Sequence, residues 1–165
     1  MPFATSILVA TDLSPASYAA LAETARIAAL CAKSLGTEPL PVRLLHVFDV
    51  APFRLLPADA RLPASTLRRI AEEANGAAHS VLLGLCGRFF QGLPRLDVHI
   101  VEHDGAAAGI CASAQSLGAD LIIMASHGRS GRSAAAHGST TAKVVRGAPC
   151  RVLVVPSDDP ESHTH

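Results

Sequence analysis

Three hydroxyl side chains stand in a row near the C-terminal end of the sequence: Ser139, Thr140 and Thr141. They follow Gly138, and a glycine-rich stretch from Gly128 leads to them. Glycine lets a ligand approach the backbone closely, and hydroxyl groups can donate hydrogen bonds to phosphate oxygens. The pattern after Gly138 predicts a helix start, and a helix N-terminus attracts anions. These residues indicate a phosphate-binding loop. The alternative is an ordinary N-cap, which needs a single hydroxyl.

Other polar residues of the same loop are assigned smaller roles. Arg129 and Arg132 add positive charge beside the expected phosphates. For His127, a hydrogen bond that braces the loop is favoured over catalysis. Neither G-x-x-x-x-G-K-[ST] nor a G-x-G-x-x-G after the first strand occurs in the sequence, so the loop is not one of these two phosphate-binding types.

The elements that must position this loop follow from the hydrophobic pattern. Short apolar runs that predict strands alternate with longer helical patterns. The strands are expected at residues 6–11, 41–50, 94–105, 120–128 and 150–156. This alternation predicts a doubly wound, parallel, five-stranded sheet with helices on both faces. We expect residues 1–156 to form a single domain and residues 157–165 to be a disordered acidic tail.

Ligands of such sheets bind beyond the carboxyl ends of the strands, where the strand order reverses. The residues to inspect there are Ala10, Thr11 and Asp12 after the first strand, His46 and Val47, His103 and Asp104, and the stretch 125–138. Asp12 is expected to contact the ligand, with a helix cap as the alternative. His46 is expected to be a half-buried histidine whose ring is hydrogen-bonded.

Composition narrows the class of protein. The 165 residues carry 14 basic and 14 acidic side chains, and a net charge of zero argues against general nucleic-acid binding. No apolar run is long enough for a membrane span, and the N-terminus lacks a signal-peptide pattern, so a cytoplasmic protein is expected. The four cysteines lack metal or redox spacing and are interpreted as small buried hydrophobes. No metal site formed by side chains is expected.

The sequence resembles the universal stress protein family, whose ATP-binding members carry G-x2-G-x9-G-[ST] in this loop. Gly128, nine further residues and then Gly138-Ser139 match the last part of that motif. The resemblance covers nearly the whole chain, because "ILVATDLSPAS", "LLHV", "ADLIIMASHGRSG" and "APCRVLVVP" resemble the first, second, fourth and last strands of the family, in that order. It implies a Rossmann-like fold similar to the adenine-nucleotide alpha-hydrolases.

The resemblance also implies roles for individual residues. Asp12 would hydrogen-bond the ribose, Ala10 would line the pocket, and the Val47 backbone would read the adenine edge. The stretch from Met124 to Gly128 would pass beneath the ribose and phosphates. The implied nucleotide-binding set is Ala10, Thr11, Asp12, Val47, Met124, Ala125, His127, Gly128, Arg129, Gly138, Ser139, Thr140 and Thr141.

Two positions depart from the family pattern. Ala125 replaces the first glycine of the motif, so a methyl group stands where members have none. Residues 134–137 read Ala-Ala-Ala-His, where members often carry bulky apolar side chains. Both departures bear on the affinity with which the loop would bind a nucleotide.

The expected function is that of a cytosolic, stress-related regulatory protein. It would bind ATP, or ADP or AMP, with Mg²⁺ or Mn²⁺ held through the phosphates, and act as a nucleotide-dependent switch or partner-binding module. The alternatives are a non-nucleotide dimeric interaction module with a degenerate loop, or an enzyme that hydrolyses ATP slowly. No nucleophile–base pair is evident, so catalysis is weakly supported. The apolar last strand is expected at a sheet edge, where Val152, Leu153, Val154 and Val155 would form a homodimer contact.

Overall fold

The computed structural model describes residues 4–50, 52, 63–127 and 139–157. Its strands are β1 (Ile7–Ala10), β2 (Val42–Asp49), β3 (Leu96–His103), β4 (Leu121–Ala125) and β5 (Arg151–Val155). Its helices are the 3-10 turn η1 (Pro15–Ser17), α1 (Tyr18–Leu35), α3 (Ala64–Phe89), α4 (Ala106–Ser116) and α5 (Ser139–Gly147). Among the described residues, no helix combines the length and apolar character needed to cross a membrane.

The five strands form one parallel sheet in the order β3-β2-β1-β4-β5. The chain first runs outward from β1 through β2 to β3, and then returns to place β4 on the other side of β1. The strand order therefore reverses between β1 and β4. The predicted doubly wound parallel sheet is confirmed, and so is the position of the last strand at an edge.

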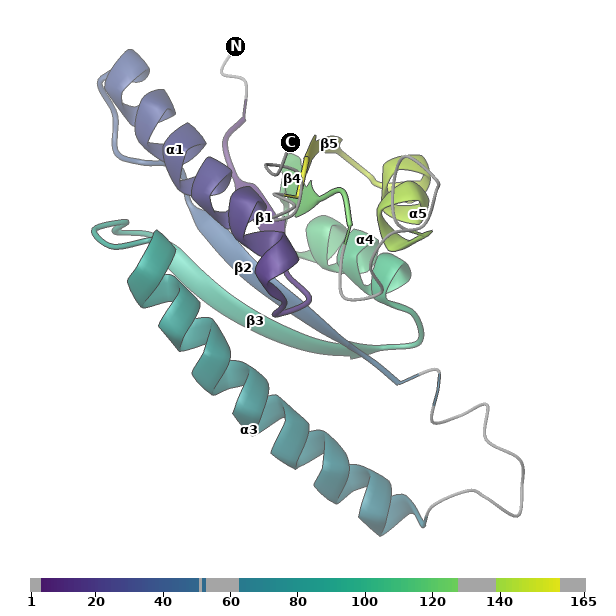
Figure 1. Cartoon of the computed structure of the whole chain (residues 1–165). Coiled ribbons are helices and arrows are strands. Elements are labelled where there is room, and N and C mark those ends of the chain that lie inside the picture. Colours follow the sequence, from purple (N-terminus) through teal and green to yellow (C-terminus); the bar gives the residue numbers. More distant parts are fainter. Residues whose placement is uncertain (1–3, 51, 53–62, 128–138, 158–165) are drawn as a thin grey trace, which may run out of the picture.

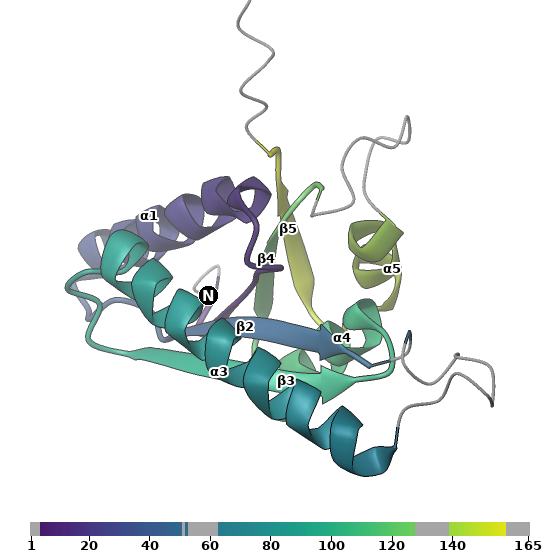
Figure 2. The same cartoon turned by 60° about the horizontal axis from the view of Figure 1, so that its bottom comes forward.

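Helices cover both faces of the sheet: α1 and α3 lie over one face, and α4 and α5 over the other (Figures 1 and 2). Side chains alternate between the faces along each strand. In β1, Ile7 and Val9 pack into the cluster beneath α1 and α3, whereas Leu8 and Ala10 pack beneath α4 and α5. Burial on both faces explains why the central strands are continuously apolar.

Ser14 followed by Pro15 is a sequence pattern typical of a helix start, but the first α-helix begins a few residues later. Pro15–Ser17 forms a 3-10 turn, and α1 proper starts at Tyr18. Ser14 makes no capping hydrogen bond, because its hydroxyl donates to Asp12 Oδ1 at 2.6 Å instead. Gly36 ends α1 in a left-handed conformation with φ of 62°, which glycine adopts without a steric penalty.

A carboxylate ties the amino ends of β1 and β4 together. Asp120 accepts hydrogen bonds from the Thr5 backbone N–H at 2.8 Å, the Thr5 hydroxyl at 2.7 Å and the Ser6 N–H at 3.0 Å. Partial burial alone would raise the pKa of this carboxyl group, but these hydrogen bonds outweigh it and the pKa is lowered. The charged form of Asp120 is therefore part of the folded structure.

The four cysteines are less buried than their sequence context predicts, because each is only partly buried. Cys111 and Cys150 pack against the cluster beneath α4 and α5, and Cys86 packs against the opposite cluster. All four thiols are free. Burial raises the pKa of Cys86, Cys111 and Cys150. A raised pKa lowers the thiolate fraction at neutral pH, so these thiols are poor nucleophiles.

Candidate functional site

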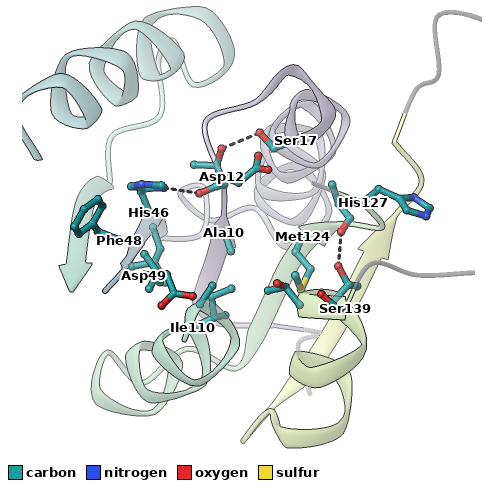
Figure 3. A pocket seen from close by; sticks show the side chains of 17 residues that line it. Ala10, Asp12, Ser17, His46, Phe48, Asp49, Ile110, Met124, His127 and Ser139 are labelled. Atoms are coloured by element: carbon teal, nitrogen blue, oxygen red, sulfur yellow. Dashed lines mark hydrogen bonds between the residues drawn. The ribbon is translucent and has the colours of Figure 1, made fainter. Parts of the chain in front are cut away.

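A pocket of about 390 Å³ opens at the carboxyl ends of β1, β2 and β4 (Figure 3). The first turns of α4 and α5 close its other side. Its volume falls within the roughly 300–1,000 Å³ typical of small-molecule sites. The pocket lies at the reversal of strand order, where doubly wound sheets bind their ligands.

The predicted site residues that the structure describes all line this pocket. They are Ala10, Thr11, Asp12, Val47, Met124, Ala125, His127, Ser139, Thr140 and Thr141. Gly128, Arg129 and Gly138, together with the 134–137 run, lie outside the described residues. The sheet thus gathers side chains from three strand ends and one helix start that are far apart in the sequence.

The N-terminus of α5 faces the pocket through its first three residues. The first N–H groups of a helix have no partner within it, so they are available to an anion. Thr141 is buried, and its hydroxyl donates to the Ala125 carbonyl at 3.0 Å. That hydroxyl proton therefore anchors α5 to the end of β4. Ser139 and Thr140 are more exposed and are the hydroxyls accessible to a ligand.

The loop after β1 is held by a hydrogen-bond network that presents Asp12. Ser17 Oγ donates to the Ser14 carbonyl at 2.8 Å, so the Thr11 hydroxyl must donate to Ser17 Oγ, also at 2.8 Å. Thr11 Oγ1 in turn accepts from the Leu13 N–H at 3.0 Å, and Asp12 Oδ1 accepts from the Ser14 N–H at 3.0 Å. Leu13 takes a left-handed φ of 68°, which is uncommon for a large side chain. The network stabilises this turn.

The backbone of Val47 points towards the centre of the pocket. Successive residues of a central strand direct their N–H and C=O groups alternately to the two neighbouring strands. Pro41 and Leu45 accept hydrogen bonds from Ile7 and Thr11, so odd-numbered residues of β2 face β1. β1 ends at Ala10, which pairs with Leu45. The Val47 N–H and C=O consequently extend past the end of β1.

The two ends of the pocket differ in charge. Asp49 lines the pocket, and its Oδ1 accepts a hydrogen bond from the Gly105 N–H at 3.0 Å, at the N-terminus of α4. This end therefore carries a carboxylate, which repels anions. The opposite end carries the N-terminus of α5 with Ser139 and Thr140. A ligand with one anionic end would place that end at α5.

Two histidines line the pocket, and both are hydrogen-bonded. His46 is buried, and its Nδ1 donates to the Thr11 carbonyl at 2.9 Å. A carbonyl can only accept, so His46 carries a proton on Nδ1. His127 Nδ1 lies 3.0 Å from Ser126 Oγ, and its ring points away from the centre of the pocket (Figure 3). The expected loop-bracing bond of His127 is observed.

Ala125 stands in β4 and pairs with Val155. Among the described residues, Leu13 is the non-glycine residue with positive φ, so Ala125 has ordinary strand geometry. Its side chain packs in the cluster beneath α1 and α3. Replacing the motif glycine by Ala125 therefore causes no backbone strain.

The structure adds pocket residues that the sequence did not single out as pocket-lining. They are Ser17, Leu45, Phe48, Asp49, Ala106 and Ile110. Conversely, His103 and Asp104 are not among the lining residues, because β3 is an edge strand separated from β1 by β2. The strand-end rule indicates Phe48 and Asp49, which end β2. No local signal indicates Ala106 and Ile110, which reach the pocket through the packing of α4.

A doubly wound parallel sheet with a pocket at its reversal point defines an α/β protein with a candidate ligand site. The sequence model of the universal stress protein family matches residues 4–156, so the chain belongs to the universal stress protein family. Among curated proteins, none matches the chain significantly.

Solved structures agree with this assignment. UspA from Lactobacillus plantarum is 28% identical with a TM-score of 0.68, covering 92% of this chain and 97% of its own. A hypothetical protein solved as a test case of structural genomics is 25% identical with a TM-score of 0.67, covering 94% and 97%. A universal stress protein in complex with cAMP shares the fold at 20% identity and a TM-score of 0.55, covering 94% and 99%.

Proposed function

We propose that the chain binds an adenine nucleotide in this pocket, with ATP as the first ligand and ADP or AMP as alternatives. The phosphates lie at the N-terminus of α5 and in the loop that precedes it, and the base lies against Val47. Binding controls a switch or a partner-binding surface in a stress-related protein. Mg²⁺ or Mn²⁺ accompanies the phosphates, because phosphate oxygens are ligands that both ions prefer.

The observation that carries the proposal is the polarity of the pocket. One end has the N-terminal N–H groups of α5 with Ser139 and Thr140, and the other has Asp49 with the backbone of Val47. Asp12 lies between the two ends, because it follows β1, which stands between β2 and β4 in the sheet. Phosphates require an anion site, a ribose requires a hydrogen-bond acceptor such as a carboxylate, and a base requires a backbone edge. A universal stress protein of the same fold has been solved with cAMP, which makes adenine nucleotides the first ligands to test.

The test places a negative charge at the proposed phosphate site. Ser139→Glu puts a carboxylate on the first residue of α5, where acidic side chains favour the helix itself. We expect the fold to persist and ATP affinity, measured by calorimetry, to fall at least about tenfold through charge repulsion. Val145→Glu is the matched control, because Val145 is exposed on the same helix and is not among the pocket residues.

A second measurement helps to separate the alternatives. Acid release of small molecules from the purified protein, followed by chromatography, shows whether a nucleotide copurifies with it. If wild type neither carries nor binds adenine nucleotides, the non-nucleotide interaction module is the better description. If Ser139→Glu and Val145→Glu bind ATP equally well, a nucleotide site exists elsewhere.

We also propose that the chain forms a homodimer through the free edge of β5. The support is the position of β5 at the end of the sheet and its apolar side chains on both faces: Val152 packs on one face, and Leu153 and Val155 on the other. An uncovered apolar edge strand invites pairing, and pairing with a second copy closes it symmetrically.

A further inference from the structure

Helix α4 approaches the sheet unusually closely at Gly109. A Cβ atom built on Gly109 would lie 2.7 Å from Val47 Cγ1 and 2.9 Å from His103 Cβ. Ordinary contacts between carbon atoms are about 3.5–4.0 Å. Gly109 is therefore the residue that lets α4 lie this close to β2 and β3.

A side chain at position 109 could not be accommodated by rotation of its neighbours. His103 Cβ is bonded directly to the backbone of β3, so no rotamer moves it away. Val47 is β-branched, and its χ1 is restricted. Relief at both contacts requires α4 and the sheet to separate.

The same turn of α4 forms a wall of the pocket. Ala106 and Ile110 stand four residues apart on one side of the helix, and both line the pocket together with Val47. The Gly105 N–H binds Asp49 Oδ1 and holds the start of the helix to the end of β2. Any displacement of α4 at Gly109 consequently moves this wall relative to Val47.

We propose that Gly109 is a positioning residue that sets the width of the slot between α4 and Val47, and that this slot receives the flat base of the nucleotide. The inference rests on the proposed nucleotide binding and adds the element that recognises the base. The phosphates lie at α5, so changes at Gly109 act on recognition of the base and leave phosphate binding intact.

The test compares Gly109→Ala with Gly87→Ala. Gly87 is also a helical glycine, but a Cβ there meets nothing within 4 Å. Each protein is titrated by calorimetry with ATP and with inorganic tripolyphosphate, which lacks the base. We expect Gly109→Ala to weaken ATP by about tenfold, a change of about 1.4 kcal/mol, and to leave tripolyphosphate within about twofold. Gly87→Ala should match wild type for both ligands. The midpoint temperature of thermal unfolding should fall by several degrees for Gly109→Ala and should not fall for Gly87→Ala.

A second variant covers the case in which Gly109→Ala does not fold. Ile110→Val shortens the wall by one methylene group without adding volume, and it should also weaken ATP while leaving tripolyphosphate unchanged. The inference is overturned if the variant that folds binds ATP as tightly as wild type does. The proposed function still stands in that case. A parallel loss of ATP and tripolyphosphate overturns the inference as well. A wild type that binds no adenine nucleotide overturns the proposed function, and the inference with it.

Discussion

Single residues in the pocket divide into groups that hold the protein together and groups that face the ligand. The hydroxyls of Thr11 and Thr141 both donate within the protein, to Ser17 Oγ and to the Ala125 carbonyl. The Val47 backbone and the hydroxyls at the start of α5 remain oriented towards the pocket. The proposed recognition of the base therefore uses a backbone edge, and a backbone edge has one fixed donor and one fixed acceptor.

Backbone reading at Val47 predicts discrimination between purines. Adenine presents an amino donor beside a ring acceptor, and guanine reverses the two. We expect GTP to bind at least about tenfold more weakly than ATP, because its edge would leave buried polar groups unpaired. Competition calorimetry measures the two affinities, and equal affinity for ATP and GTP would contradict backbone recognition.

Asp120 predicts a pH dependence of stability. Its pKa is lowered in the folded protein, so its contribution is complete above the unfolded pKa of about 3.9 and is lost as pH falls through the lower folded value. We expect Asp120→Asn to reduce the free energy of unfolding at pH 7 by about 1–2 kcal/mol. The difference from wild type should shrink below about pH 4.

Urea unfolding at several pH values measures this effect. Asp97→Asn is the control, because Asp97 is exposed on β3. A constant difference between wild type and Asp120→Asn down to pH 3 would show that the charge of Asp120 is not what stabilises the fold.

Among the elements, the ends of β4 and β5 are joined directly beside the pocket. The Ser126 N–H donates to the Val155 carbonyl at 2.8 Å, and the Ser157 N–H donates to Ser126 Oγ at 3.1 Å. Ser157 Oγ accepts from the His127 N–H and donates to the His127 carbonyl, each at 3.3 Å. The sequence places Ser157 in the tail, but in the structure it holds the last described residue before the glycine-rich loop.

Removal of this hydroxyl should loosen the start of the loop. We expect Ser157→Ala to speed hydrogen exchange of the His127 amide roughly fivefold, the factor that a hydrogen bond of about 1 kcal/mol is worth. Global stability should change by less than about 0.5 kcal/mol. Amide exchange by NMR measures this, with Ser80→Ala as control, because Ser80 bonds only within its own helix in the described structure. Unchanged exchange at His127 would show that Ser157 does not hold it.

For the whole molecule, the order of the strands leaves one side of β5 without a neighbouring strand among the described residues. The Val155 carbonyl faces β4, where it accepts from Ser126. By alternation, the backbone groups of Leu153 also face β4, and those of Val152 and Val154 point away from the sheet. A second copy pairing with this edge would use the groups of Val152 and Val154.

This geometry predicts opposite effects of proline at adjacent positions. Val154→Pro removes an N–H that faces away from the sheet, so the monomer should fold while the proposed dimer is lost. Leu153→Pro removes a ladder hydrogen bond to β4 and should unfold the protein. Light scattering at micromolar concentration and circular dichroism measure both. A monomeric wild type would refute the dimer, and a dimer unmoved by Val154→Pro or Val154→Asp would have its interface elsewhere.

The sequence alone determined the elements and the class of sheet, because both depend on local patterns. Continuous apolar runs in alternation with helical patterns predict buried parallel strands, and the observed strands lie within the predicted ranges and are two to four residues shorter. The hydroxyl row at Ser139 and the strand-end positions of Asp12 and Val47 were equally visible, since the binding edge of a doubly wound sheet follows from its topology.

The tertiary structure alone decided what depends on residues far apart in the chain. It placed β1 between β2 and β4, which brings Val47 and Ser139 to one pocket. It brought Gly109 against Val47 and His103, and it assigned the Thr141 hydroxyl to Ala125. No local periodicity encodes these contacts, because each is set by the packing of a helix on a sheet whose strands come from distant segments.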